Sequence, residues 1–167
     1  MTDVNKGNVT HQRLISLLSE QGATYRVLSH KAVGKCEAVS EIRGTALGQG
    51  AKALVCKVKG NGVNQHVLAI LPADQQADLN QLAGHIGGLR ASLASPAEVD
   101  ELTGCVFGAI PPFSFHPKLK LVADPLLFER FTEIAFNAGL LEKSVIMDTK
   151  DYLRIAQPEL VPFHRAQ

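Results

Sequence analysis

Lys52 lies in an apolar segment with the pattern of a β-strand, and it is the residue with the clearest potential for chemistry. Residues 51–59 read AKALVCKVK. Because side chains alternate across a strand, one face is expected to carry Lys52, Leu54, Cys56 and Val58. A lysine on such an apolar face must extend to solvent, pair with an acid or line a cavity. The spacing alone favours a structural lysine and leaves a catalytic role open.

A proline-rich loop after Gly108 is the second candidate. Residues 104–113 read GCVFGAIPPF, in which two prolines stiffen the chain. A glycine before them lets backbone N–H groups approach a ligand closely. His116 lies a few residues further on. On this pattern alone, an ordinary tight loop and a surface histidine are the simpler interpretations.

The sequence shows no pattern typical of a metal site or a covalent nucleophile. The six histidines show no His-x-x-x-His spacing, and no Gly-x-Ser-x-Gly turn is present. The three cysteines, Cys36, Cys56 and Cys105, are an odd and widely spaced set without a Cys-x-x-Cys pair. We therefore expect free thiols in a reducing cytoplasm, and no cofactor.

Composition limits the partners. The 167 residues are 46% hydrophobic and 20% charged, with a net charge of +1. No run of about 18 apolar residues appears, so no membrane association is expected. The balanced charge argues against DNA binding through a broad basic surface, but a local patch can still dock on the end of one nucleic acid. Candidate residues for such a patch, each more simply a solvated lysine, are Lys57, Lys59, Lys118 and Lys120.

The apolar periodicity predicts helices and strands in mixed order. Helices are expected around 14–18, 37–47, 78–86, 96–103 and 149–156, and strands over 24–30, 51–59, 66–71, 105–109, 119–123, 132–136 and 143–147. Ser95 and Glu98 form a capping-box pattern, and Gly104 is expected to end that helix. These elements predict one α+β domain over residues 1–167, with a core of about 10–157 and a mixed, mostly antiparallel sheet surrounded by helices.

Several segments, taken in order, resemble one known family. They are the glycine turn at 48–50 with AKALV at 51–55, SPAE at 95–98, LTG at 102–104, GAIPPF at 108–113 and LVAD at 121–124. Over residues 22–157 this set resembles the YbaK/prolyl-tRNA-synthetase-associated editing-domain family, and within it the free-standing YeaK-type proteins. Many relatives carry a small polar residue before the last proline of the loop, where this chain has Pro111.

The resemblance implies hydrolysis of the ester that joins an amino acid to the 3′ acceptor end of a tRNA. It places the family's lysine on Lys52 and its glycine on Gly108 as catalytic residues. The loop borders the amino-acid pocket in the family, so the expected substrate contacts are Ala109, Ile110, Pro111, Pro112 and His116. An aminoacyl ester is already activated, so a positioned water and backbone donors to the oxyanion are sufficient. Lys52 could hold the terminal phosphate or orient the ester, and the resemblance suggests that the adjacent ribose hydroxyl assists proton transfer.

Two other functions remain open from the sequence. A module of the same fold could bind aminoacyl-tRNA or an aminoacyl-tRNA synthetase without hydrolysis. A third possibility is a hydrolase of another small activated ester. The presence of Lys52 and Gly108 favours the deacylase over the binding module, whereas Pro111 fits the binding module.

Overall fold

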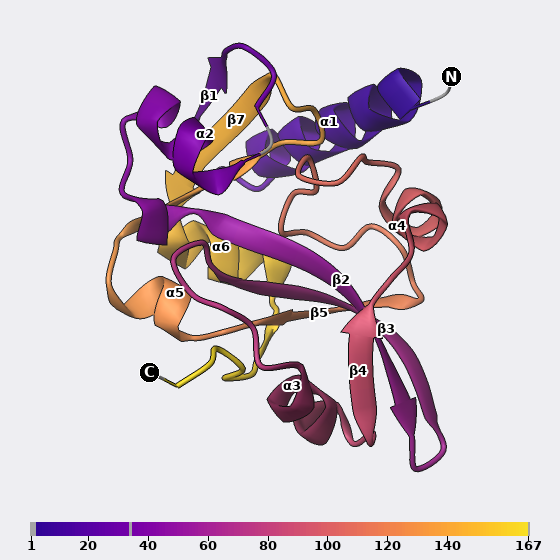
Figure 1. Cartoon of the computed structure of the whole chain (residues 1–167). Helices are drawn as coiled ribbons and strands as arrows, with labels where there is room; N and C mark the ends of the chain where they lie inside the picture. Colours follow the sequence, from indigo (N-terminus) through magenta and orange to yellow (C-terminus); the bar gives the residue numbers. More distant parts are fainter. Residues whose placement is uncertain (1–2, 34, 167) are drawn as a thin grey trace.

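The structure is a computed structural model that describes residues 3–33 and 35–166. Its strands form two sheets (Figure 1). The larger sheet contains, in spatial order, β4 (Arg90–Leu93), β2 (Ala51–Gly60), β3 (Val63–Pro72), β5 (Leu119–Ala123) and β8 (Glu159–Leu160). The smaller contains β1 (Tyr25–Ser29), β7 (Lys143–Asp148) and β6 (Glu133–Asn137). A parallel bridge between Gly50 and Ala135 joins the sheets.

Strand pairing is mixed but mostly antiparallel. The β3–β5 and β5–β8 pairs are parallel, and the remaining pairs between the described strands are antiparallel. Strands β2 and β3 form a long hairpin in which Lys52 pairs with Leu71. Its turn uses Asn61 and Gly62, with φ values of 54° and 79°, as expected for an Asn-Gly hairpin turn. The predicted α+β class is confirmed, although the strands divide between two sheets.

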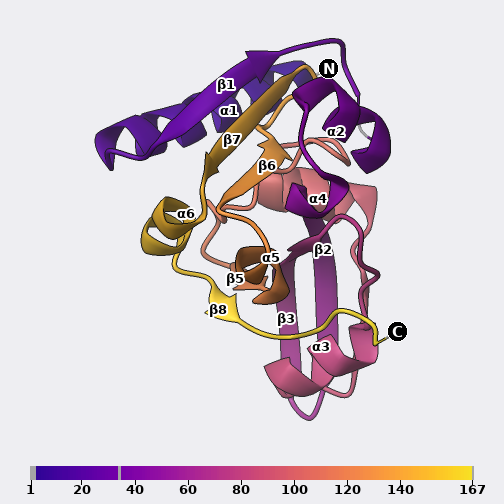
Figure 2. The same cartoon turned by 90° about the vertical axis from the view of Figure 1, so that its left-hand side faces the viewer.

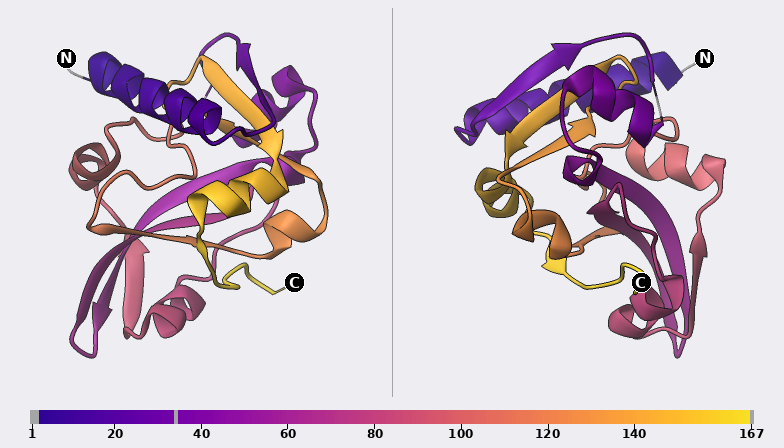
Figure 3. Two further views of the ribbon diagram at one scale, coloured as in Figure 1. Left: turned by 180° about the vertical axis from the view of Figure 1, so that it is seen from behind. Right: turned by 60° about the vertical axis from the view of Figure 1, so that its left-hand side comes forward.

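Helices cover both ends of this framework. They are α1 (Asp3–Glu20), α2 (Cys36–Arg43), the 3₁₀ turn η1 (Leu47–Gln49), α3 (Leu79–Ile86), α4 (Pro96–Thr103), α5 (Leu126–Glu129) and α6 (Thr149–Ala156). Helix α1 lies along the smaller sheet, and α3 lies near the hairpin turn at the opposite end (Figure 2). Seen from behind, α6 crosses the long strands (Figure 3). No helix in the described ranges is long and apolar enough to cross a membrane.

The alternation of β2 divides its side chains between two hydrophobic clusters. Ala51 and Val55 belong to the larger cluster, together with Leu14 of α1 and Tyr152 of α6. Cys56 and Val58, on the opposite face, belong to a smaller cluster that includes residues of α3. Strand β2 is therefore buried on both faces along most of its length, which explains its almost continuous apolar sequence.

The capping signals around α4 are confirmed. The Ser95 hydroxyl accepts a hydrogen bond from the Glu98 N–H, and the Glu98 carboxylate accepts one from the Ser95 N–H. Gly104 ends the helix with a φ of 69°. The Glu98 carboxylate also binds Lys57 at 2.7 Å and His66 at 2.6 Å. Together these contacts hold the pKa of Glu98 well below its usual range, the lysine having the largest effect.

Two predicted elements were wrong. The helix expected over 37–47 ends at Arg43, because Gly44 adopts a φ of 72° and its N–H closes the helix on Glu41 and Ser40. The chain then makes the separate turn η1. The strand expected over 105–109 is a turn in which the Ala109 N–H donates to the Val106 carbonyl at 3.0 Å. The short strands β4 and β8 were not predicted.

Candidate functional site

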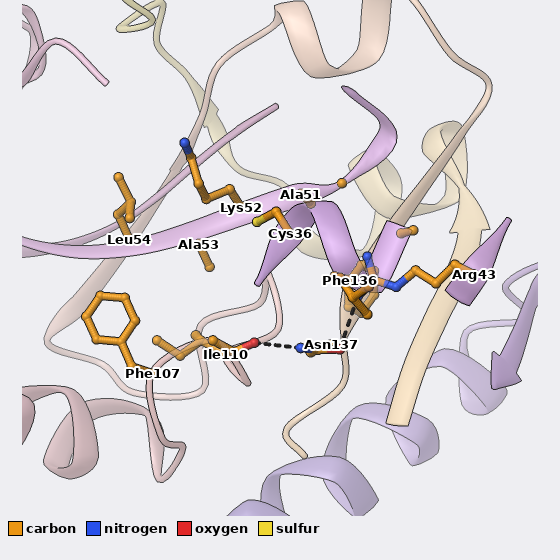
Figure 4. A pocket seen from close by; sticks show the side chains of 14 residues that line it. Cys36, Arg43, Ala51, Lys52, Ala53, Leu54, Phe107, Ile110, Phe136 and Asn137 are labelled. Carbon is orange, nitrogen blue, oxygen red and sulfur yellow. Dashed lines mark hydrogen bonds between the residues drawn. The ribbon is translucent and has the colours of Figure 1, made fainter. Parts of the chain in front are cut away.

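A small pocket opens where the two sheets meet. Its volume is about 150 Å³, and it lies between α2, the start of β2, the turn at 107–110 and the end of β6 (Figure 4). Ala51 and Ala53 point from β2 toward the side that carries Ile110 and Asn137. Ile110 and Phe136 are almost fully buried, so the inner wall is apolar. A pocket of this size has room for a small side chain and little more.

Cys36 lies on the first turn of α2 and lines the pocket. Burial raises the pKa of its thiol, although the positive charge of Lys52 opposes the rise. The thiol is therefore protonated at neutral pH and is a poor nucleophile. Cys56 and Cys105 are buried and unpaired, as predicted, and burial raises the pKa of both thiols. A covalent thioester mechanism has no support in this arrangement.

Asn137 organises the polar end of the pocket. Its side-chain N–H groups donate to the carbonyls of Gly108 at 2.8 Å and Val33 at 3.1 Å. Its oxygen accepts hydrogen bonds from Arg43 at 3.1 Å and from Ser144 at 3.2 Å. Because Asn137 is only 6% exposed, these bonds satisfy a buried amide completely. Asn137 therefore connects α2, the Gly108 turn and the smaller sheet.

Arg43 is the second polar group at this end of the pocket. Its Nε donates to the Ser144 hydroxyl at 2.9 Å, and that hydroxyl lies 2.7 Å from His30 Nε2. Burial lowers the pKa of Arg43 to about 10, so the guanidinium is still charged at neutral pH. In the described chain no carboxylate lies within ion-pair distance of it. The remaining guanidinium N–H groups are available to a polar ligand.

Gly108 occupies the third position of the turn at 106–109, with a φ of 89°. That left-handed conformation is the one a type II turn requires at this position, and glycine adopts it without strain. Both sides of the turn are held, because Asn137 binds the Gly108 carbonyl and the Gly139 N–H donates to the Ala109 carbonyl at 2.8 Å. The Gly108 N–H has no acceptor among the described residues.

Lys52 stands at the rim of the pocket. Its side chain points to the opposite side of β2 from Ala53 and Phe107 (Figure 4). Its Nζ donates to the Gln75 carbonyl at 2.6 Å, and the residue is half-buried. Of the three possibilities considered from the sequence, pairing with an acid is not seen among the described residues: Lys52 lies at the edge of the pocket, and its ammonium reaches a backbone carbonyl. A backbone carbonyl is a neutral partner, so the positive charge of the ammonium is not compensated there.

The other predicted site residues lie at different places. Ile110 lines the pocket, whereas Ala109 is fully buried and holds the turn. Pro111 borders a separate small cavity, and the Pro112 carbonyl accepts a hydrogen bond from Tyr152. His116 lines a hollow against α1, where its Nδ1 accepts a hydrogen bond from the backbone of residue 118. The structure therefore brings together Lys52, Gly108 and Ile110 only.

The four lysines considered as a basic rim do not line this pocket. Lys57 pairs with Glu98, and Lys120 pairs with Glu159. Lys59 lies near the hairpin turn, at the opposite end of β2 from the pocket, and Lys118 precedes β5.

Arg43, Phe107 and Asn137 are among the pocket residues that were not singled out from the sequence. Asn137 lies just beyond the strand expected over 132–136, and it is in fact the last residue of β6. Arg43 had no signal, because an arginine at the end of an amphipathic helix is usually a solvated residue. Phe107 was placed in a strand, where an aromatic side chain needs no special explanation.

Asn137→Ala is expected to lower the free energy of unfolding by about 1–3 kcal/mol, because it leaves the carbonyls of Gly108 and Val33 and one N–H group of Arg43 without their hydrogen-bond partner. Urea denaturation measures the change. Asn64→Ala is the matched control, since Asn64 is exposed on β3 and should shift stability by no more than about 0.5 kcal/mol. Equal midpoints for the two variants would contradict a structural role for the Asn137 network.

Comparison with known proteins adds an independent line of information. Residues 30–155 match a family described as "Aminoacyl-tRNA editing domain". A protein of Escherichia coli (strain K12) described as "Multifunctional Ser/Thr-tRNA deacylase ProXp-y" is 86% identical over 165 residues, which cover 99% of each chain. The protein of the same name from Escherichia coli O157:H7 matches to the same extent.

Solved structures match the fold over nearly the whole chain. The crystal structure of a hypothetical protein has a TM-score of 0.80 at 20% identity, covering 91% of this chain and 99% of its own. The crystal structure of a candidate trans-editing enzyme for prolyl-tRNA synthetase has a TM-score of 0.78 at 22% identity. The match covers 94% of this chain and 98% of that enzyme's chain. At these identities the likeness concerns the fold alone.

Proposed function

Because the chain belongs to the aminoacyl-tRNA editing domain family, we propose that it removes serine and threonine from wrongly charged tRNAs. The family, the fold class and the deacylase activity predicted from the sequence are confirmed at the level of the family and its similar relatives. The amino acids are taken from the printed name of the 86% identical relative. The substrate is therefore an aminoacyl-tRNA, and the bond broken is its ester.

The pocket supports a small hydroxylic amino acid. Its volume of about 150 Å³ suits a serine or threonine side chain better than a large one. Arg43 and Asn137 make the inner end polar, and the guanidinium has N–H groups free to donate to a hydroxyl. A pocket built to bind a hydroxyl discriminates strongly against an amino acid that lacks one, because its buried donors are then unpaired.

One observation carries the proposed chemistry: Gly108 lines the pocket and its N–H has no acceptor in the described chain, while its carbonyl is fixed by Asn137. A fixed N–H of this kind can stabilise the oxyanion that forms when water attacks the ester, typically worth about 10²–10³ in rate. The protonated Cys36 thiol makes direct attack by water the simpler route. No carboxylate or histidine of the described residues lines the pocket, and the family resemblance suggests that the ribose hydroxyl beside the ester assists proton transfer.

Lys52 supplies a positive charge that can leave its present hydrogen-bond partner and bind the substrate. Two cationic side chains line the pocket, and Arg43 is bound to Ser144 and Asn137. Lys52 has one acceptor in the described chain, a backbone carbonyl that water can replace. Its long flexible side chain can therefore move onto a phosphate of the tRNA end or onto the ester.

The test is a deacylation assay on tRNAs charged with serine, threonine, alanine and proline. We expect hydrolysis of the seryl and threonyl esters well above the spontaneous rate, and slower hydrolysis of the other two. Hydrolysis of none of the four would overturn the deacylase proposal. Binding of charged tRNA without hydrolysis would point instead to the binding module. Hydrolysis of alanyl ester at the seryl rate would contradict recognition of the hydroxyl.

Activity is expected to survive exhaustive treatment with EDTA. The described residues contain no group of three or more His, Cys, Asp or Glu side chains placed to hold a metal ion. The oxyanion donors proposed above are backbone groups, which need no cofactor. The measurement is the deacylation rate before and after chelation, with untreated enzyme as the control. Loss of turnover on chelation and its recovery with zinc would show that this mechanism is wrong.

The partner and location follow from this proposal. The protein contacts the 3′ acceptor end of tRNA, without recognition of DNA, and it works in the cytoplasm, where its three cysteines stay reduced. Contact with an aminoacyl-tRNA synthetase stays a prediction.

A further inference from the structure

Phe107 is an exposed aromatic residue at the mouth of the pocket. It is 59% exposed, although it also lines the pocket. It is the one phenylalanine among the large hydrophobic side chains exposed in the described ranges. The aromatic pairs in the same ranges involve Phe113, Phe136, Tyr152 and Phe128, so the ring of Phe107 has no aromatic partner. Ligand pockets are commonly lined by aromatic side chains, so an exposed ring that also lines the pocket is available to contact a ligand.

The backbone that carries this ring is anchored. Phe107 is the second residue of the turn at 106–109. Next to it, the carbonyl of Gly108 is bound by Asn137 and the carbonyl of Ala109 by Gly139. A ring on an anchored turn loses little conformational freedom when a flat ligand stacks on it, which favours binding.

The size of the pocket decides which part of the substrate reaches Phe107. Its volume of about 150 Å³ is well below the roughly 300 Å³ at which pockets begin to enclose a drug-sized ligand. The amino acid can enter, but the nucleoside that carries it must remain at the mouth. Arg43 and Asn137 lie at one end of the pocket and Phe107 at the other (Figure 4). With the amino acid at the polar end, the nucleoside extends toward Phe107.

We infer that Phe107 is a stacking platform for the terminal adenine base of the aminoacyl-tRNA. This inference rests on the proposed deacylase function and adds a base subsite to it. Stacking of a base on an aromatic ring suits any tRNA, because every base has a π-face and the ring reads no sequence. The chain otherwise offers few aromatic platforms, since it has no Trp and two Tyr. Phe107 acts as a positioning residue that sets the ester against the Gly108 turn.

Two substrates separate this role from a structural one. With threonyl-adenosine, Phe107→Ala is expected to lower kcat/KM by about 5- to 100-fold, the range typical of one lost base stack. With threonyl-ribose, which lacks the base, wild type and variant should react equally. Phe107→Tyr should keep most of the activity and Phe107→Leu should not. Val106→Ala is the matched control, because Val106 is the exposed neighbour of Phe107 and is not among the residues that line the pocket.

A binding measurement tests the stacking without turnover. The chain has no Trp and two Tyr, so Phe107→Trp introduces a single tryptophan at the mouth, which can be excited selectively at a wavelength where tyrosine does not absorb. AMP is expected to quench its emission in a saturable way, and ribose 5-phosphate, which has the same phosphate but no base, is not. Equal responses to the two ligands, or an unchanged kcat/KM of Phe107→Ala on threonyl-adenosine, would overturn the inference. If wild type deacylates no tRNA, the proposed function fails, while the quenching result still decides whether Phe107 binds a base.

Discussion

Lys52→Ala is expected to lower kcat/KM for deacylation by about 100-fold, equivalent to about 2.7 kcal/mol of lost transition-state stabilisation. The ammonium is one of two positive charges lining the pocket and the only one of the two not bound to side chains in the described structure. Lys52→Arg should restore activity only in part, because a planar guanidinium does not replace a compact ammonium at a confined rim. The measurement is kcat/KM on threonyl-tRNA for wild type and both variants.

Stability distinguishes a functional Lys52 from a structural one. The hydrogen bond to Gln75 is made at a half-buried site where water can take the place of the ammonium, so the denaturant midpoint should change little. A structural lysine would instead lose about 1 kcal/mol or more on truncation, with the chemistry hardly affected. Lys59→Ala is the control on the same strand, since Lys59 is exposed near the hairpin turn. If Lys52→Ala deacylates at the wild-type rate, the functional role proposed for Lys52 is wrong, whatever the denaturant midpoint of the variant.

Gly108→Val is expected to lower the deacylation rate by about 10²–10³-fold, the effect of losing one oxyanion donor. The φ of 89° is strained for any residue with a β-carbon, so valine should rotate the turn and misdirect the Gly108 N–H. The fold should persist, because neighbouring Ala109 and Ile110 remain buried in the larger hydrophobic cluster. The measurement is kcat at saturating threonyl-tRNA, with circular dichroism to verify the fold.

The control for this variant is Gly62→Val. Gly62 has a similar φ of 79° in the hairpin turn, and an added β-carbon there meets no atom within 4 Å. It should therefore cost a similar strain of about 1–2 kcal/mol without changing the rate. Equal rates for Gly108→Val and wild type would remove the turn from the mechanism. Equal rate losses for both glycine variants would mean that loss of stability, and not loss of a donor, explains the effect.

Local sequence signals were sufficient to predict those features of the structure that depend on residues close together in the chain. The capping box of Ser95 and Glu98, the helix end at Gly104 and the Asn61-Gly62 turn all involve groups a few positions apart, so the chain determines them without distant contacts. The same holds for strand β2, whose apolar run identified Lys52 as unusual. The ordered motifs around Lys52 and Gly108 were also enough to indicate the family that the comparisons confirm.

Tertiary structure decided the rest, because the missing information lay in residues far apart in the chain. Strand β4 exists through pairing with β2, and β8 through pairing with β5. The 105–109 segment has strand-like residues, but Asn137 and Gly139 hold it as a turn. Arg43 and Asn137 became pocket residues only when α2 met the end of β6. The sequence by itself indicated most of the local elements and the chemistry proposed for Lys52 and Gly108; contacts across the fold determined the pocket that surrounds these two residues.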